Sequence, residues 1–233
     1  MYVEWAPEER LAGRIACLWS YEAGESDAHT LVVPDGCVDL IWGPQGPFVA
    51  GPDTGPHPTS LSAGETFTGI RFLPGAVGGV LGVPMDALRD LRVPLADLGE
   101  RGRPPFEVRG PDDLARAVAV RLSEAPGPDP AAPAILRALR VGTRVGTVAA
   151  DLGFSERHLY RRCMAAFGYG PKTVQRVMRF QHALRLARRG RPLADVAAAS
   201  GYADQAHMTN DVRRLAGVPL SELAAPAPAS SAA

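Results

Sequence analysis

Short apolar runs separated by clusters of glycine and proline mark the first hundred residues. Runs of this kind predict strands, and they cover residues 14–21, 30–33, 38–42, 48–50 and 67–72. Pro34-Asp35-Gly36 lies between two of them, and Asp-Gly in this setting predicts a hairpin over residues 31–42. Several short strands with such turns favour a small barrel or sandwich.

Helical spacing replaces the strand pattern after Pro74. Residues 76–81 and 84–91 predict short helices, and residues 111–124 predict a stronger one. Residues 125–133 hold four prolines and offer nothing to bury, which is typical of a semi-rigid spacer. We therefore expect a first domain over residues 1–124, a linker over 125–133, a second domain over 134–225 and a disordered tail over 226–233.

The pattern of residues 147–168 predicts a helix-turn-helix. Val148 and Leu152 share one helical face, and Gly153 lies where the turn needs a positive φ. Ser155 can cap the second helix, in which apolar residues again recur at helical spacing. This arrangement leaves an outward face, which in a helix-turn-helix meets the major groove. Its members are Arg157, His158, Tyr160, Arg161 and Arg162.

A second copy of the first helix and turn follows 48 residues later. Residues 147–154 (TVAADLGF) align with residues 195–202 (DVAAASGY), and beyond the turn the offset grows by one residue. Residues 171–189 between the copies predict a long helix with proline in its first turn. Such a helix would hold two recognition helices at a fixed separation, and a spacing of roughly 34 Å would let both enter successive major grooves.

Charge divides the chain in the same place. The 233 residues hold 25 Lys+Arg and 25 Asp+Glu, but residues 131–233 carry a net charge of +9 and residues 1–130 a net charge of −9. The C-terminal part therefore suits a polyanion such as double-stranded DNA. Only Lys172 among the basic residues is lysine, and the arginine excess partly reflects a composition rich in Ala, Gly and Pro.

The remaining composition argues against several other classes. Cys17, Cys37 and Cys163 are scattered and lack the spacing of a zinc site, and His29 and His57 are isolated, so we expect no metal or other cofactor. The chain begins without a basic leader and apolar core, and no apolar run approaches the ~18 residues of a membrane span. These features favour a cytoplasmic protein with no membrane partner. No nucleophile elbow is present, so we expect no enzyme activity.

Residues 134–224 resemble the AraC/XylS family of bacterial transcription regulators. The resemblance rests on the paired units and on three segments in the family's order: GFSERHLYR at residues 153–161, FGYGP at residues 167–171 and GYADQAHM at residues 201–208. It implies one all-α DNA-binding domain of two helix-turn-helix units joined by a long helix. The implied partners are double-stranded DNA, a possible homodimer and, for an activator, RNA polymerase.

The resemblance also implies which side chains approach DNA. Outward residues of both recognition helices reach base edges, which matches arginine pairing with guanine and Gln or Asn pairing with adenine. The expected DNA-binding set is Ser155, Arg157, His158, Tyr160, Arg161, Arg162, Lys172, Gln205, His207, Thr209, Asn210 and Arg213. The family commonly has an arginine at the position of Asn210, so the second unit reads DNA weakly or contributes mostly backbone contacts.

The N-terminal half resembles uncharacterised sensor domains of the same family through residues 34–42 (PDGCVDLIW), 50–52 (AGP) and 69–76 (GIRFLPGA). Such domains are often cupin-like barrels that bind a small molecule and dimerise. Asp35, Asp39 and Arg71 are the candidate ligand-binding residues, although Asp35 beside Gly36 is more simply explained as a turn residue. The expected fold class is α+β, with a mainly-β cupin-like barrel followed by the helical domain.

Three functions follow from these patterns. The first is a sequence-specific DNA-binding regulator whose N-terminal domain senses an unknown small-molecule effector. The second is a DNA-binding protein whose N-terminal domain only dimerises, which a filled barrel interior would favour. The third is an enzyme fused to a DNA-binding domain, as in repair proteins that use a zinc-bound set of four cysteines; three scattered cysteines do not supply that set.

Overall fold

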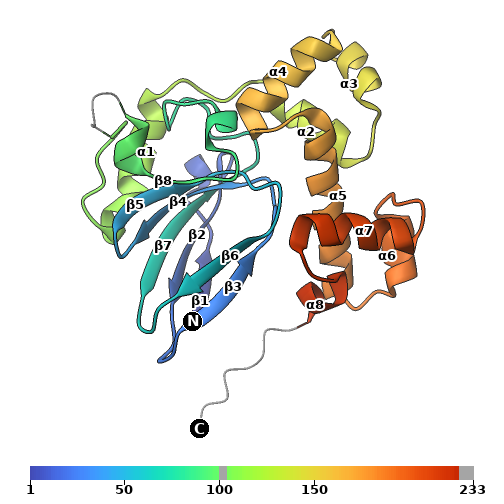
Figure 1. The fold of residues 1–233 in the computed structure, drawn as a ribbon. Coiled ribbons are helices and arrows are strands. Elements are labelled where there is room, and N and C mark those ends of the chain that lie inside the picture. The colour runs from blue at the N-terminus through green and yellow to red at the C-terminus, as the bar shows by residue number, and fades with distance from the viewer. Residues whose placement is uncertain (100–103, 226–233) are drawn as a thin grey trace.

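The structure, a computed structural model, describes residues 1–99 and 104–225. Two antiparallel sheets form the N-terminal domain (Figure 1). The strands are β1 (Tyr2–Trp5), β2 (Ile15–Glu22), β3 (Ala28–Val32), β4 (Val38–Gly43), β5 (Gly46–Ala50), β6 (His57–Leu61), β7 (Thr66–Phe72) and β8 (Arg92–Pro94). One sheet has the order β1-β2-β7-β4-β5-β8, and β3 pairs with β6 in the other.

The two faces of the six-stranded sheet have different roles. One face packs Leu40, Ile70 and Phe72 against buried residues of α1 (Leu114–Glu124) and of the 3-10 helix η2 (Met85–Leu88). Alternate residues point the other way, toward the β3–β6 ribbon. The register of β2 shifts between Ile15 and Cys17, which lets Ile15 join the first face although Cys17 lies on the second.

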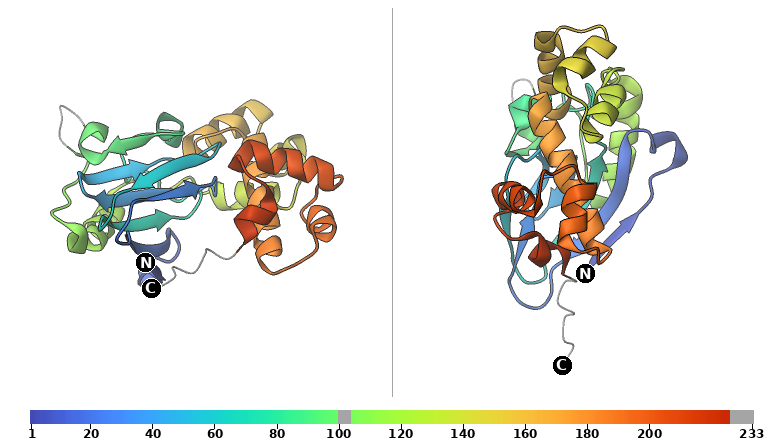
Figure 2. Two further views of the ribbon diagram at one scale, coloured as in Figure 1. Left: turned by 60° about the horizontal axis from the view of Figure 1, so that its bottom comes forward. Right: turned by 90° about the vertical axis from the view of Figure 1, so that its right-hand side faces the viewer.

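Helices form the C-terminal domain, which lies beside the sheets (Figures 1 and 2). They are α2 (Ala132–Arg140), α3 (Val145–Asp151), α4 (Glu156–Phe167), α5 (Pro171–Arg188), α6 (Leu193–Ala199), α7 (Gln205–Ala216) and α8 (Leu220–Ala224). The long helix α5 contributes buried residues along its whole length, including Val174, Phe180 and Leu184, and the other helices pack around it. The sequence-based fold class and the long connecting helix are confirmed.

Several local predictions were wrong. The hairpin over residues 31–42 does not form, because β3 pairs with β6 whereas β4 pairs with β5 and β7. Gly36, with φ +82°, instead turns the chain from one sheet to the other. Residues 76–81 form turns rather than a helix, and Gly78 has a φ of +60° there. Strands β1, β6 and β8 were not predicted.

The predicted linker contacts the rest of the protein at several points. Gly79 N donates a hydrogen bond to Pro126 O (2.9 Å), and α2 begins at Ala132, two residues earlier than expected. The predicted tail over residues 226–233 lies outside the described residues. In the described parts of the chain, every helix is too short or too polar to cross a bilayer.

Candidate nucleic-acid interface and ligand cavity

The first helix-turn-helix consists of α3 and α4. Gly153 in the turn has a φ of +70°, and the Ser155 hydroxyl accepts a hydrogen bond from His158 N (3.2 Å) as an N-cap. Leu159 and Cys163 on α4 are fully buried. Helix α4 ends at Gly168, which has a φ of +84°. The predicted turn, cap and buried face are therefore confirmed.

The outward side of α4 divides into two stripes. Arg157, Tyr160 and Arg161 are exposed, and Tyr160 keeps 51% of its surface accessible. His158 and Arg162 lie four residues apart on a neighbouring stripe, where the His158 ring packs 4.8 Å from Phe154 and the Arg162 guanidinium lies 4.6 Å above the Phe154 ring. Only the first stripe is open to a partner.

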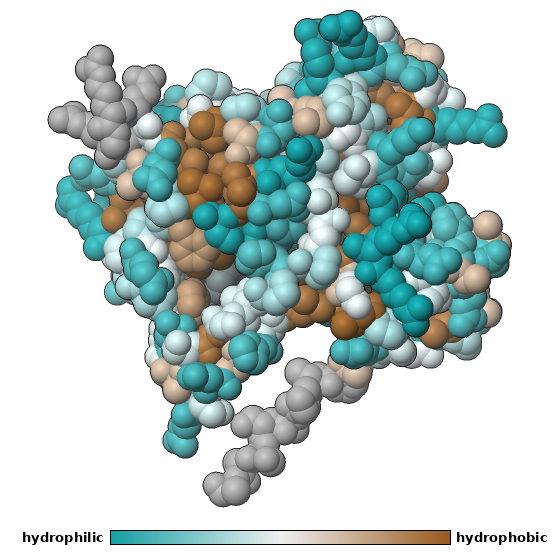
Figure 3. Space-filling model, in the orientation of Figure 1, coloured by the Kyte–Doolittle hydropathy of each residue, from teal (hydrophilic) through white to brown (hydrophobic). Residues whose placement is uncertain are grey.

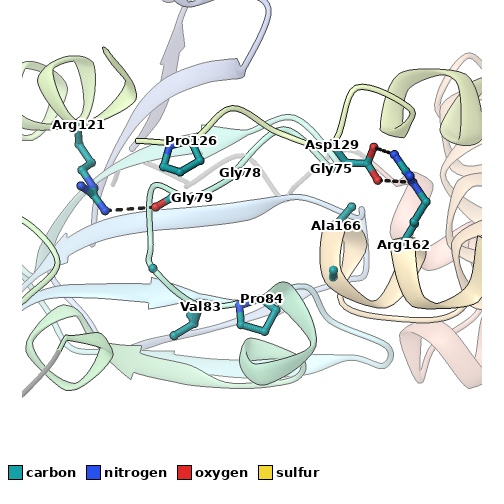
Figure 4. A pocket seen from close by; sticks show the side chains of 12 residues that line it. Gly75, Gly78, Gly79, Val83, Pro84, Arg121, Pro126, Asp129, Arg162 and Ala166 are labelled. Atoms are coloured by element: carbon teal, nitrogen blue, oxygen red, sulfur yellow. Dashed lines mark hydrogen bonds and ion pairs between the residues drawn. The ribbon is translucent and has the colours of Figure 1, made fainter. Parts of the chain in front are cut away.

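Arg162 differs from its expected role on the open face. Its Nε donates to Asp129 Oδ2 (2.8 Å), and its terminal nitrogen donates to Asp129 Oδ1 (Figure 4). Burial alone would raise the pKa of Asp129, but the hydrogen bonds from Arg162 and from Ala131 N lower it overall. Arg162 therefore ties the recognition helix to the linker in this structure and does not present a free cation.

The second helix-turn-helix, α6 and α7, repeats the design. Gly201 has a φ of +75°, and Asp204 Oδ1 accepts a hydrogen bond from His207 N (2.7 Å). The extra residue is Ala203, because Tyr202 is followed by Ala203 and Asp204 where Phe154 is followed directly by the cap Ser155. Most expected contact residues of this unit are exposed, and Thr209 is half-buried with its hydroxyl donating to Gln205 O. The exposed ones are Gln205, His207, Asn210 and Arg213.

Asp211 anchors α7 to the long helix. This residue is 6% exposed, and its carboxylate accepts hydrogen bonds from Arg176 Nε (3.0 Å) and from a terminal nitrogen of Arg179 (3.1 Å). The Arg179 guanidinium also lies 4.2 Å above the Tyr202 ring. Two arginines of the helical domain are thereby paired with a buried carboxylate, and the sequence pattern had not identified Asp211 as a structural residue.

Other basic residues of this domain remain at the surface. In residues 132–225, ion pairs involve Arg162, Arg176 and Arg179 and leave the other cations without a carboxylate partner. Exposed examples include Arg157, Arg161, Lys172, Arg185, Arg188, Arg189, Arg191, Arg213 and Arg214. Hydrophilic side chains accordingly gather over the helical domain in Figure 3, whereas hydrophobic ones gather over part of the β domain.

A cavity of about 680 Å³, partly open to solvent, lies between the second sheet face and the β3–β6 ribbon. Strand register places its residues in rows across the sheet. One row joins Cys17, Arg71, Asp39, Ala50 and Arg92. The next row joins Trp19, Gly69, Ile41, Phe48 and Pro94. The cavity therefore has one polar row and an adjoining apolar wall.

Asp39 and Arg71 occupy the centre of the polar row. Asp39 Oδ1 accepts hydrogen bonds from Trp19 Nε1 (2.8 Å) and Arg71 Nε (3.1 Å). Burial raises the pKa of Asp39 to about 6, against the opposing effect of Arg71. The Arg71 guanidinium lies 3.9 Å from Asp35 Oδ2. The structure thus brings all three predicted ligand residues together.

Asp35 nevertheless lies outside the cavity wall. Its Oδ1 accepts a hydrogen bond from Cys37 N (2.8 Å), which is the turn role that its sequence context favoured. Sequence reasoning missed Trp19, Tyr2, Phe48 and Phe67, which line the cavity. Alternation within each strand could have indicated one face, but the strand order that joins these faces was not available from the sequence.

Comparison with known families supports a helix-turn-helix domain in the C-terminal region. Residues 148–225 match the family described as "Helix-turn-helix domain". The C-terminal region is an AraC-type helix-turn-helix domain. Residues 3–94 match a family described as "Domain of unknown function (DUF6597)". A search of curated proteins gave no significant match.

Solved structures give weaker similarities. A probable AraC family transcriptional regulator from Rhodopseudomonas palustris CGA009 is 22% identical, covers 39% of this chain and 90% of its own, and has a TM-score of 0.34. ToxT from Vibrio cholerae is 11% identical over 96% of both chains, with a TM-score of 0.46. ToxT of strain SCE256 with an unsaturated fatty acid bound is 12% identical over 88% of this chain and 90% of its own, with a TM-score of 0.43.

The AraC-type domain contacts the β domain mainly through its first unit. Helix α4 packs on η2, and Gln181 Nε2 of α5 donates to Pro34 O (2.7 Å). The turn after α4 is held closely, because a Cβ on Gly168 would lie 2.4 Å from Pro52 Cγ. A second cavity of about 500 Å³ lies at this junction, beside the Asp129–Arg162 pair and the glycine-rich turn at residues 75–82 (Figure 4).

Among the described residues, no group of three or more His, Cys, Asp or Glu side chains is placed to hold a metal ion. Cys17 and Cys37 lie near Arg71, whereas Cys163 belongs to the separate core of the AraC-type domain. Burial raises the pKa of the Cys17 thiol to about 11. These thiols are therefore protonated at neutral pH and are weak nucleophiles.

Proposed function

We propose that this chain is a sequence-specific transcription regulator that reads DNA through α4 and α7 and binds a small molecule between its two sheets. The observation that carries the proposal is the duplicated helix-turn-helix around α5, with Arg157, Tyr160 and Arg161 exposed on the first recognition helix. A recognition helix with exposed arginines suits guanine edges in the major groove. The surplus of surface arginines in the same domain suits the phosphate backbone.

Individual roles follow from exposure. Arg157 and Arg161 are proposed to contact guanine, and Gln205 and Asn210 adenine, because their side chains are exposed on α4 and α7. Lys172 and Arg213 are proposed to contact phosphates. Ser155, His158 and His207 make contacts within the fold, as a cap or as aromatic contacts, so we propose that they approach the DNA backbone and not the bases.

The cavity supports a sensing role for the N-terminal domain. Its volume of about 680 Å³ lies within the range of roughly 300–1,000 Å³ that is typical of small-molecule sites. A domain that served dimerisation alone would need no such interior. Contacts from residues 34–36 to α5 connect the loop beside the cavity with the helix that carries both units, which favours transmission of ligand binding to DNA.

The test begins with DNA selection and sequencing with the full-length protein, with binding to the selected site then measured by fluorescence anisotropy. Arg157→Ala and Arg161→Ala should each lower affinity by ~1–3 kcal/mol and relax preference at one base position. Arg116→Ala, which removes an exposed arginine of α1 in the other domain, serves as the control and should leave affinity unchanged. Failure of the full chain to prefer any sequence would contradict the proposal.

A further inference from the structure

One carboxylate, that of Asp39, and two guanidinium groups, those of Arg71 and Arg92, line the polar end of the 680 Å³ cavity. Asp39 and Asp35 approach Arg71 Nε at 3.1 and 3.9 Å, and Glu4 Oε1 approaches its NH1 at 3.9 Å. The other cavity arginine, Arg92, is neutralised separately, because both its terminal nitrogens donate to Asp53 (2.8 and 2.7 Å). Asp35, Asp53 and Glu4 lie outside the wall, but with Asp39 they make four carboxylates paired with two arginines, and this surplus of negative charge favours a negative potential at this end.

Aromatic side chains form much of the remaining wall. Trp19 lies flat across β7, since a Cβ on Gly69 would fall 2.2 Å from its Cε2. Phe48 and Phe67 pack against Gly43, since a Cβ on Gly43 would lie 3.2 Å from Phe48 Cε1 and 3.0 Å from Phe67 Cε1. The faces of such rings attract cations, most strongly when the site excludes water. This aromatic wall lies next to the carboxylate of Asp39, because the indole N–H of Trp19 donates a hydrogen bond to Asp39 Oδ1.

Asp39 keeps capacity for one more donor. Its side chain is 13% exposed, Oδ1 accepts from Trp19 and Arg71, and Oδ2 has only a longer contact of 3.3 Å with the same Arg71 Nε. A carboxylate oxygen can accept two hydrogen bonds. A donor entering the cavity can thus bond Oδ2 without displacing either existing partner.

We propose that the cavity binds an organic cation, an amine or quaternary ammonium attached to an apolar or aromatic body. The positive group lies against Asp39 and the faces of Trp19 and Phe67, and the apolar body fills the space toward Phe48 and the β3–β6 ribbon. This inference rests on the proposed sensing function and names its ligand class. An anion would meet arginines whose charge is already neutralised by Asp35, Asp39, Asp53 and Glu4.

Three probes that share a phenyl ring and a short chain test the charge preference: 2-phenylethylammonium, 2-phenylethanol and phenylacetate. Titration of the full-length protein by calorimetry should rank them cation, neutral, anion. We expect at least about a tenfold difference in Kd between cation and anion, because the head group changes sign beside a partly buried carboxylate. Tighter binding of phenylacetate, or no binding by any probe, would overturn the inference.

Variants then locate the cation. Asp39→Asn should weaken 2-phenylethylammonium binding about tenfold or more, and Asp35→Asn should weaken it less, because Asp35 lies outside the wall. Asp27→Asn is the matched control, because Asp27 does not line the cavity. Its Oδ1 accepts a hydrogen bond from Ala63 N, and asparagine retains this oxygen. Thermal melting checks that each variant is folded. Unchanged binding by Asp39→Asn would contradict the proposal.

A pH titration with phenyltrimethylammonium gives an independent readout, because this probe stays charged. Asp39 lies near Arg71 on the neighbouring strand β7, Asp35 and Cys37 on the preceding loop, and Cys17 and Trp19 on β2. Glu4 on β1 pairs with the same Arg71, and His57 and Arg92 line the same cavity. The pKa of Asp39 is raised to about 6, so affinity should fall as the pH drops through about 6. Asp39→Asn should abolish this fall, and a fall that persists would assign it to another group and contradict the inference.

DNA binding separates this inference from the proposed function. The same protein is tested on its selected DNA in parallel with the probes. Loss of the probe preference with intact sequence-specific DNA binding would remove the cation assignment alone. Loss of sequence-specific DNA binding would instead remove the function on which the assignment rests.

Discussion

The two helix-turn-helix units share a scaffold but differ in what surrounds it. Each has a first helix of 7 residues and a recognition helix of 12 residues. Each recognition helix begins at a capping side chain, Ser155 or Asp204, and ends at a glycine with positive φ, Gly168 or Gly217. The two units therefore have the same backbone arrangement, and they differ in the side chains that face outward and inward.

Equivalent outward positions carry different chemistry. The second, fifth and sixth residues of α4 are Arg157, Tyr160 and Arg161. On α7 the same positions hold Ala206, Thr209 and Asn210. The first unit thus presents two cations where the second presents none, so we expect the first to make the stronger contacts with DNA.

The seventh position shows a reversal of charge. Arg162 on α4 pairs with Asp129 of the linker, whereas Asp211 on α7 pairs with Arg176 and Arg179 of α5. An arginine also covers the turn aromatic in both units, Arg162 above Phe154 and Arg179 above Tyr202. The first unit is consequently tied to the linker and the β domain, and the second is tied to the long helix.

The largest expected difference between the units concerns this seventh position. Asp211→Ala leaves Arg176 and Arg179 without their shared carboxylate and should lower the free energy of unfolding by ~2–3 kcal/mol, below the ~3–5 kcal/mol of a fully buried pair. The discount follows from the partial exposure of the two arginines, 38% and 23% of their side chains. Urea unfolding of the full chain, followed by circular dichroism, measures the change.

Asp129→Ala is the matched change in the first unit. Its carboxylate is 20% exposed and pairs with one arginine rather than two, so we expect a loss of only about 1 kcal/mol. Equal losses in the two variants would show that the units are anchored with similar strength and would remove this part of the comparison.

Local signals made the scaffold predictable. The turn glycines, the Ser155 cap and the apolar faces all act within a few residues, so the sequence indicated α3, α4 and α5 before any packing was known. The internal repeat added a second, independent indication for α6 and α7. Arg157 and Arg161, four residues apart, were also placed correctly on the open face of α4.

Long-range pairing explains what was missed. Asp35-Gly36 between two apolar runs is equally compatible with a hairpin and with a corner between sheets, and the pairing of β3 with β6 decides between them. Arg71 and Asp39 are adjacent only because β4 and β7 pair in one particular register. Arg162 was assigned to DNA by its position beside Arg161, but one residue rotates the side chain by about 100° around a helix, toward Asp129.

An intermediate effect is expected from giving the second unit the outward charge of the first. Asn210→Arg should raise affinity for DNA by about 1 kcal/mol through a new charged hydrogen bond, and the slope of log K against log salt should steepen by roughly 0.9. Anisotropy titrations at several salt concentrations measure both. Ala63→Arg adds the same charge on an exposed loop of the β domain and should change neither. An unaltered affinity in Asn210→Arg would show that this face of α7 stays away from DNA.

The smallest expected effect concerns the junction of the β domain with α5, the helix between the two units. A Cβ on Gly36 would lie 2.9 Å from Met178 Cε, and the same residue has a φ of +82°. Gly36→Ala therefore combines backbone strain of ~1–2 kcal/mol with displacement of Met178. Gly64 has a φ of +73° and no atom near its Cβ position, so Gly64→Ala measures the backbone strain alone. The difference between the two losses of unfolding free energy isolates the contact with α5, and we expect about 0.5 kcal/mol because the end of a methionine side chain adapts easily. If Gly36→Ala costs no more than Gly64→Ala, the loop beside the cavity does not press on α5, and the proposed effect of a ligand on the two units would have to pass through the packing of η2 on α4 instead.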